Sequence, residues 1–201
     1  MTFHKRFHLS APVLLVASER VYDSMFKRSV VLILEHDDRG ALGFVINKKT
    51  KITLESAIGN PAVGLVHEPV WQAGPHDLKS GYVLHNKKKQ HHEKQLVPGV
   101  VMSAAEESIQ SLINYYSRQA KPLVYWGTKS SPIFYPYRLL VGHTGWGPGQ
   151  LDHELALGRW FSLPLRTEVV FSDPQLDLWS LCQKETRQSG LYQIRAHLNT
   201  Y

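Results

Sequence analysis

The chain has 201 residues, 43% of them hydrophobic, with a formal net charge of +6 and a single cysteine, Cys182. This length and apolar content favour one domain with a packed core, and the lone cysteine excludes an internal disulfide. A single thiol also fits a reducing compartment, so we expect a cytoplasmic protein. The apolar run at residues 11–17 is too short for a signal peptide or a membrane span, so we expect no membrane partner.

The first fifty residues predict a strand, a turn and a β-hairpin. Residues 12–17 form an apolar run that opens with proline and is typical of a buried strand, and residues 23–26 are typical of one capped turn. Residues 29–36 and 41–47 are rich in Leu and β-branched residues, which favour strands. Because Asp37-Asp38-Arg39-Gly40 supplies turn chemistry between them, these two strands are expected to pair as a hairpin.

The middle of the chain predicts two helices and two short strands. These elements are a helix at 53–58, strands at 70–73 and 82–85, and a helix at 103–118. Thr53 provides a cap and Gly59 a stop for the first helix. Ser103 and Glu106 match a capping box, and the apolar residues behind them recur at helical spacing, which indicates an amphipathic second helix.

The last third of the chain continues the alternation of strands and helices. It predicts strands at 122–126, 137–142 and 166–171, helices at 148–157 and 173–181, and a polar tail at 185–201. Several strand pairs are joined by short turns, which a purely parallel sheet cannot have. We therefore predict an α+β fold, with one compact domain over residues 1–201 and a mixed, mostly antiparallel sheet with flanking helices.

Two segments carry a resemblance to a known family. The first includes Asp23, Phe26 and the hairpin from Ser29 to Asn47, with Gly40-Ala41-Leu42-Gly43 at its turn. The second is the run from Gly142 to Leu151 (GHTGWGPGQL), followed by Glu154-Leu155 and Trp160. Both resemble the signature segments of the AlgH/YqgE family of bacterial proteins, and the resemblance extends over about residues 10–180.

This resemblance implies a compact fold in which a bifurcated mixed sheet curls toward a barrel. It also implies the label of transcriptional regulator, which the alginate-linked members carry. The chain departs from the family pattern at three places. Ser24 replaces a usual Pro, Lys48-Lys49 replaces Arg-Pro, and Ala73-Gly74-Pro75-His76 replaces Gly-Gly-Pro-Val.

The glycine-rich segment is the first candidate site, and its signature residues are Gly145, Trp146, Gly147, Gly149 and Gln150. Glycines between a strand and a helix could cradle an anion at the helix N-terminus. However, the P-loop and dinucleotide patterns are absent, and Pro148 removes one N–H. We favour a structural turn in which close backbone approach and positive φ require glycine, so that Gly147→Val lowers the melting temperature by several degrees.

No catalytic, cofactor-binding or metal-binding residue is predicted. Asp152 and Glu154 diverge by about 200° on their helix, so they cannot share an ion. The imidazoles of His85, His91 and His92 lack rigid metal-ligand spacing, and Cys182 is expected to be a buried, inert thiol.

An alternative is a ligand pocket lined by Asn47 and His143, which close strands within the signature segments, together with Trp146.

One charge run indicates contact with anions. Residues 86–94 (NKKKQHHEK) contain four lysines and one acid, Glu93. We call these four lysines the polyanion patch: Lys87, Lys88, Lys89 and Lys94. Contact with nucleic acid through them would be driven by phosphates, weak, salt-sensitive and indifferent to sequence. The predicted helix at 103–118 has the wrong charge for reading the major groove, because it carries Glu106 and Glu107.

Two classes of function remain open. The favoured one is a non-enzymatic regulatory or interaction protein, with a polyanion or another protein as its partner. The alternative is a small-ligand-binding protein or enzyme that uses the glycine-rich segment with Asn47 and His143.

Overall fold

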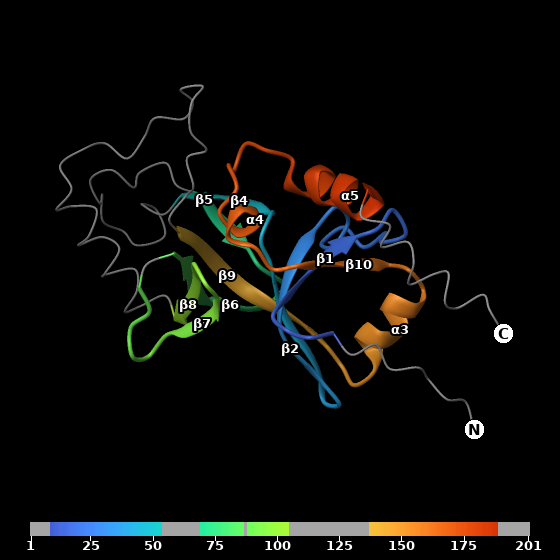
Figure 1. Ribbon diagram of the computed structural model, residues 1–201, viewed down its shortest axis with the longest axis horizontal. Coiled ribbons are helices and arrows are strands. Elements are labelled where there is room, and N and C mark those ends of the chain that lie inside the picture. The colour runs from blue at the N-terminus through green and yellow to red at the C-terminus, as the bar shows by residue number, and fades with distance from the viewer. Residues whose placement is uncertain (1–8, 54–68, 87, 105–136, 189–201) are drawn as a thin grey trace.

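The computed structural model describes residues 9–53, 69–86, 88–104 and 137–188, which form ten strands and three helices (Figure 1). The strands are β1 (Val13–Ala17), β2 (Val30–Asp37), β3 (Gly40–Val45), β4 (Lys49–Thr53), β5 (Pro69–Gln72), β6 (His76–His85), β7 (Lys94–Val97), β8 (Val100–Ala104), β9 (Tyr137–Trp146) and β10 (Trp160–Pro164). The helices are α3 (Gln150–Ala156), α4 (Thr167–Val170) and α5 (Leu178–Gln188). In this part of the chain, no helix is long and apolar enough to cross a membrane.

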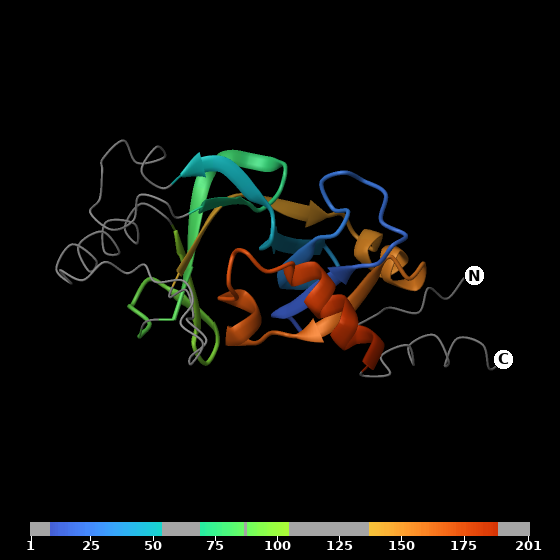
Figure 2. The same ribbon diagram turned by 90° about the horizontal axis from the view of Figure 1, so that it is seen from above.

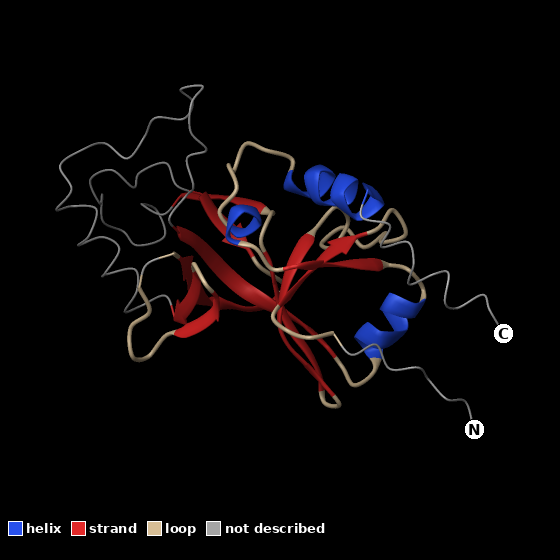
Figure 3. Ribbon diagram, in the orientation of Figure 1, coloured by secondary structure: helices blue, strands red, loops and turns tan. Residues whose placement is uncertain are grey.

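The strands form one curled sheet in the order β10-β1-β2-β3-β9-β6-β8-β7, with β4 and β5 branching from β9. All pairings between the described strands are antiparallel except that of β5 with β9, which is parallel. In the described part of the chain, strands dominate and helices are few, as Figure 3 shows. The predicted α+β class with a mostly antiparallel mixed sheet is therefore confirmed in outline.

The sheet divides at β9. The C-terminal half of β9 pairs with β3, from Gly43 opposite Thr144 to Ala41 opposite Trp146. Its N-terminal half pairs with β6 on one side and with β5 on the other. Figure 2 shows the two arms of the sheet diverging from this strand.

Two glycines allow the strands to meet closely where the sheet divides. A Cβ at Gly74 would lie 2.0 Å from the carbonyl oxygen of His143, a distance that no side chain can occupy. Gly142 has φ of +74°, and a Cβ there would lie 2.8 Å from the carbonyl oxygen of His76. Because only glycine fits these positions, both residues are requirements of the branch itself.

The core lies between the curled sheet and α5. Residues Leu14–Ala17 of β1 are completely buried, as continuous apolar strands are when both faces of the sheet are covered. One covering element is α5, which packs on β1, β2 and β10 and buries Leu178, Trp179 and Cys182 (Figure 1). Helix α3 packs against β3 and β10.

Several sequence predictions are wrong. The predicted strand at 166–171 is the one-turn helix α4, which buries the adjacent residues Val169 and Val170. Ser103 lies inside β8 and does not cap a helix, and Thr53 is the last residue of β4. Helix α5 begins at Leu178 and runs to Gln188, so it includes the start of the predicted tail. The strands β4, β7, β8 and β10 were not predicted.

Other predictions are confirmed. The hairpin of β2 and β3 turns between Asp37 and Gly40, and β9 extends the predicted strand at 137–142. The helix predicted at 148–157 is α3. The helix predicted at 53–58, the strand at 122–126 and most of the helix at 103–118 lie outside the described residues.

Candidate functional site

The glycine-rich segment forms the end of β9 and the turn into α3. The backbone N–H of Gly147 donates to Oε1 of Gln150 at 3.0 Å, and the N–H of Gln150 donates to the carbonyl of Gly147 at 3.0 Å. These bonds engage two backbone N–H groups of the segment within the turn itself, and α3 has only seven residues. The segment is therefore organised as a closed turn.

The expectation that every glycine of this turn is required is wrong. Gly149 has φ of +69° and precedes the first residue of α3, so its backbone conformation favours glycine. A Cβ at Gly147 would meet nothing nearer than Oε1 of Gln150 at 3.9 Å, and one at Gly145 would lie 3.6 Å from the carbonyl of Ala41. Both are ordinary contact distances, so sterics do not demand glycine at Gly145 or Gly147.

Trp146 belongs to an aromatic cluster built around one carboxylate. Oε2 of Glu154 accepts hydrogen bonds from the indole N–H of Trp146 at 3.1 Å and of Trp160 at 2.7 Å. The ring of Phe26 lies 6.1 Å from each indole, between centroids. Gln150 completes the set by donating to Oε1 of Glu154 at 3.3 Å. The signature residues Phe26, Trp146, Glu154 and Trp160 thus hold α3, β9 and β10 together.

The two acids of α3 contact different neighbours, as their spacing predicts. Glu154 faces the two indoles, whereas Oδ2 of Asp152 lies 3.4 Å from Nε2 of His36 on β2. In the described part of the chain, no group of three or more His, Cys, Asp or Glu residues is arranged to hold a metal ion.

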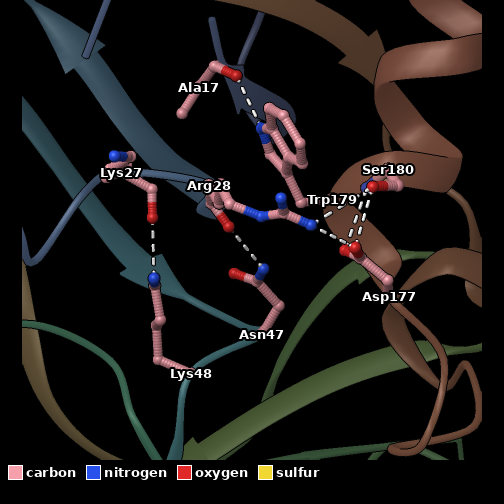
Figure 4. Close-up of polar contacts among 8 residues, drawn as sticks. All are labelled: Ala17, Lys27, Arg28, Asn47, Lys48, Asp177, Trp179 and Ser180. Atoms are coloured by element: carbon pink, nitrogen blue, oxygen red, sulfur yellow. Dashed lines mark hydrogen bonds and ion pairs between the residues drawn. The ribbon is translucent and has the colours of Figure 1, made fainter. Parts of the chain in front are cut away.

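Asn47 links the β3–β4 connection to the turn before β2. Its side-chain oxygen accepts the N–H of Val30 at 2.8 Å. Its amide donates to the carbonyl of Arg28 at 2.9 Å, as Figure 4 shows. These bonds fix Arg28 with φ of 57°, an uncommon conformation for a residue other than glycine. Lys48 adds a third link by donating to the carbonyl of Lys27 at 2.7 Å.

Sequence reasoning missed the side chain of Arg28. Its guanidinium lies 4.4 Å from the ring centre of Trp179 and pairs with Asp177, as Figure 4 shows. Burial opposes ionisation of Asp177, but hydrogen bonds from Ser180 and the charge of Arg28 outweigh it and hold the pKa of Asp177 below its usual value. Burial, and then the charge of Arg28, lower the pKa of Lys48. The sequence feature that could have pointed to this region is the basic pair Lys48-Lys49, which directly follows Asn47.

Arg138 was also missed, although it is the one charged residue in the apolar run at 137–142. It is buried, and its guanidinium lies 4.2 Å from the ring centre of Trp71. It donates to the carbonyls of Ile46 and, at 3.1 Å, Ser172. Arg138 therefore ties β9 to the end of the hairpin and to the segment after α4.

His143 contacts different residues from the other two members of the expected pocket. Its ring centre is 5.8 Å from that of His76 and 6.4 Å from that of Phe44, and its Nδ1 is buried without a hydrogen-bond partner. Asn47 instead contacts Arg28 and Val30, and Trp146 contacts Phe26, Glu154 and Trp160. The three residues have separate partners, so these contacts do not define a shared pocket.

The lysine run folds around its single acid. Glu93 is buried with its Oε1 3.0 Å from Nε2 of His85, and its Oε2 accepts the backbone N–H of Gln90 at 2.6 Å. Lys88 and Lys89 are exposed, as are His91 and His92. Lys94 is exposed and pairs with Glu35 at 3.2 Å. Lys87 lies outside the described residues.

Cys182 is buried in α5, where burial, followed by the charge of Glu185, raises the pKa of its thiol to about 11. Such a thiol is almost entirely protonated at neutral pH and is a poor nucleophile. The structure therefore agrees with the expectation of an inert cysteine.

The chain matches known proteins over most of its length. A family model described as AlgH-like matches residues 14–189. The chain belongs to the AlgH-like family. Among its relatives, a UPF0301 protein of Myxococcus xanthus is 33% identical over 173 residues, which cover 84% of this chain and 86% of the relative. A UPF0301 protein of Chlorobium chlorochromatii is 28% identical over 192 residues, covering 94% of this chain and 92% of the relative.

Solved structures show the same AlgH-like fold. The solution structure of the AlgH protein from Pseudomonas aeruginosa matches with a TM-score of 0.65 and 21% identity, over 94% of this chain and 97% of that one. A crystal structure from Corynebacterium diphtheriae matches with a TM-score of 0.63 and 21% identity, over 90% of this chain and 89% of that one. Within this fold, Phe26, Trp146, Glu154 and Trp160 of this chain form one cluster of contacts.

Proposed function

We propose that this AlgH-like chain is a non-catalytic interaction protein of the cytoplasm, which contacts a polyanionic partner through the polyanion patch. The patch is a phosphate-binding surface that reads no base sequence. The proposal rests on how the lysine run folds and on where the signature residues are engaged.

The burial of Glu93 is the observation that carries the proposal. Glu93 is the only acid in the run 86–94, and its carboxylate faces His85 with only 5% of each side chain exposed. The acid is thereby withdrawn from the surface, while Lys88, Lys89 and Lys94 remain exposed. The pair of Lys94 with Glu35 is solvent-exposed, with 56% and 60% of the two side chains accessible, and such pairs are weak enough to exchange for a phosphate.

The engagement of the signature residues supports a role without catalysis. Asn47 bonds to backbone groups of Arg28 and Val30, and Trp146 bonds to Glu154. The thiol of Cys182 is buried with a raised pKa. These groups perform structural tasks in this fold, and the single buried cysteine fits a reducing cytoplasm.

Any regulatory role of the protein would operate through association and not through base readout. Lysine side chains on a loop contact phosphates, which position a protein on a duplex but carry no sequence information. We infer that the regulator label implied by the family resemblance describes an indirect effect.

Fluorescence anisotropy tests this function with two labelled 20-base-pair duplexes of equal composition, one from a bacterial promoter and one scrambled. We expect equal, weak binding to both, and the four lysines of the patch should contribute about −3.6 to the log–log salt slope. The double variant Lys88→Gln/Lys89→Gln is expected to lower the magnitude of the slope by about 1.8. The control Lys79→Gln/Lys184→Gln removes the same charge at exposed positions elsewhere and is expected to keep the slope.

Two results would overturn the proposal. One is equal behaviour of the patch variant and the control. The other is a hundredfold preference for the promoter duplex at 150 mM salt, which would restore a sequence-specific regulator.

A further inference from the structure

We propose that a second surface, distant in sequence from the polyanion patch, binds the phosphate backbone of nucleic acid. It lies where the turn before β2 meets the β3–β4 connection, and we call it the basic junction: Lys27, Arg28, Lys48 and Lys49. This inference rests on the proposed function, in that it assumes a polyanionic partner, and it assigns a further contact site for that partner.

Hydrogen bonds hold the backbone of the junction in place. Asn47 bonds to Arg28 and Val30, and the ammonium of Lys48 donates to the carbonyl of Lys27 (Figure 4). The N–H of Gln72 on β5 also donates to the carbonyl of Lys48 at 2.8 Å. Two segments about twenty residues apart in sequence are thereby held side by side. A surface that is already ordered loses less entropy when it binds.

Tryptophan rings orient two of the four cations. The guanidinium of Arg28 stacks over Trp179 at 4.4 Å, and the ammonium of Lys49 lies 5.8 Å from the ring centre of Trp71. Lys27 and Lys49 are exposed, and half of the Arg28 side chain is exposed. The cations are therefore positioned by the fold and still accessible to an anion.

The junction carries an excess of positive charge. Among the described residues, Asp177 is the one carboxylate that forms an ion pair with these four cations, and it pairs with Arg28. Asp23, in the same turn, is a second carboxylate, and its Oδ1 accepts the backbone N–H groups of Met25 and Phe26. The four cations still outnumber these two acids. Burial lowers the pKa of Lys48 most, and the like charge of Arg28 lowers it further. An anion bound there would relieve this repulsion.

The chemistry of the junction matches phosphate. Arginine presents a planar fork of donors and lysine a compact point charge, and both are the usual protein ligands of phosphate oxygens. The whole chain has a formal net charge of +6, which attracts polyanions from a distance. Because no base-reading element accompanies these cations in the described part of the chain, the contact would be to the backbone alone.

The test removes the exposed cations and leaves the structural ones. Lys27→Gln/Lys49→Gln keeps the backbone carbonyl of Lys27, the side chain of Lys48 and the pair of Arg28 with Asp177. The scrambled 20-base-pair duplex is titrated by anisotropy between 20 and 150 mM salt. We expect the salt slope to fall in magnitude by about 1.8 and the Kd at 50 mM salt to rise about tenfold. Lys79→Gln/Lys184→Gln is the matched control, and thermal melting verifies that all variants fold.

The outcomes separate this inference from the proposed function. If the junction variant binds like the control while Lys88→Gln/Lys89→Gln weakens binding, the basic junction is overturned and the proposed function stands. If the junction variant alone weakens binding, the basic junction is supported and the role of the polyanion patch falls. If the unaltered protein does not bind at 20 mM salt, both are overturned. Tighter binding to polyglutamate than to the duplex would replace nucleic acid by an acidic protein partner and overturn the assignment to phosphate.

Discussion

Trp146 and Trp160 donate their indole N–H groups to the same oxygen of Glu154, at 3.1 and 2.7 Å. The two rings meet edge to face, with centroids 6.0 Å apart. Three signature residues of the family therefore form one structural unit, in which a single carboxylate satisfies two partly buried donors. Its removal leaves both donors without their acceptor.

We expect Glu154→Leu to lower the free energy of unfolding by about 2–4 kcal/mol, because two indole N–H groups lose their acceptor in a partly buried cluster. Urea unfolding followed by tryptophan fluorescence measures this loss. The matched control is Glu168→Leu on α4, where the exposed side chain predicts a change within about 0.5 kcal/mol. Equal stability of the two variants would show that the indoles do not depend on Glu154.

Two glycines should lose very different amounts of stability on substitution. Gly74→Ala places a Cβ 2.0 Å from the carbonyl oxygen of His143, so the strands must separate, and we expect a loss of about 3 kcal/mol or more. Gly147→Ala meets only the end of the Gln150 side chain at 3.9 Å, so we expect a loss below about 1 kcal/mol. Thermal melting of the two alanine variants compares them directly. A Gly147→Ala variant as unstable as Gly74→Ala would restore the steric requirement at the glycine-rich turn.

Replacing Asn47 should weaken the link between the β3–β4 connection and the turn before β2. Asn47→Ala removes both the acceptor of the Val30 N–H and the donor to Arg28, and we expect it to cost about 1–3 kcal/mol. Asn47→Asp retains the acceptor but places a carboxylate oxygen against the carbonyl of Arg28. It should therefore remain less stable than the parent protein. Hydrogen exchange of the Val30 amide, which accelerates if the bond is lost, is the specific readout.

The thiol of Cys182 should ionise only at a pH well above neutral. Its pKa is raised from 9.0 to about 11 chiefly by burial, so at pH 8 about 0.1% is thiolate and native protein should react slowly with a thiol reagent. Because the unfolded thiol ionises first, this group favours folding below pH 9, and its contribution is lost as the pH rises toward 11. Unfolding curves at pH 8, 9.5 and 11 test the sign. Cys182→Ala should fall less over this range, and identical pH profiles would contradict the prediction.

Purified protein should show no turnover above background with nucleotides, phosphoesters or acyl esters, with or without Zn²⁺ or Mg²⁺. The reason is that efficient hydrolysis needs a nucleophile beside a base or a metal-bound water. His143 is the side chain with which to challenge this expectation, because its Nδ1 is buried without a partner. Saturable turnover that disappears in a folded His143→Ala variant would establish an enzyme.

Local chemistry explains which elements could be predicted. The β2–β3 hairpin carries its own turn residues and apolar strands, so its turn between Asp37 and Gly40 could be predicted from the sequence. The segment 166–171 has β-branched residues but forms α4, because tertiary packing buries Val169 and Val170 together in one helical turn. Strand β4 is rich in lysine and pairs with β5, about twenty residues away in sequence. No local sequence pattern predicts that pairing.

The sequence singled out some residues of the candidate site, missed Arg28 and Arg138, and did not predict the contacts. The signature identified Asn47, Trp146 and His143 as notable, yet their partners Arg28, Glu154 and His76 come from other elements of the fold. The burial of Glu93 could not be read from a run that otherwise looks solvated, because its partner His85 lies at the end of the preceding strand. These contacts join residues from different segments of the fold, so the spacing of residues along the chain could not predict them.

The position of β9 in the chain also sets the order in which the molecule can assemble. The hairpin of β2 and β3 can form as soon as it leaves the ribosome, but its partner across the dividing point follows about 100 residues later. Until Tyr137–Trp146 is synthesised, the free edges of β3, β5 and β6 have nothing to join them. The nascent chain must keep these edges from pairing with one another or with other chains, and β9 is the strand whose arrival turns separate pieces into one sheet.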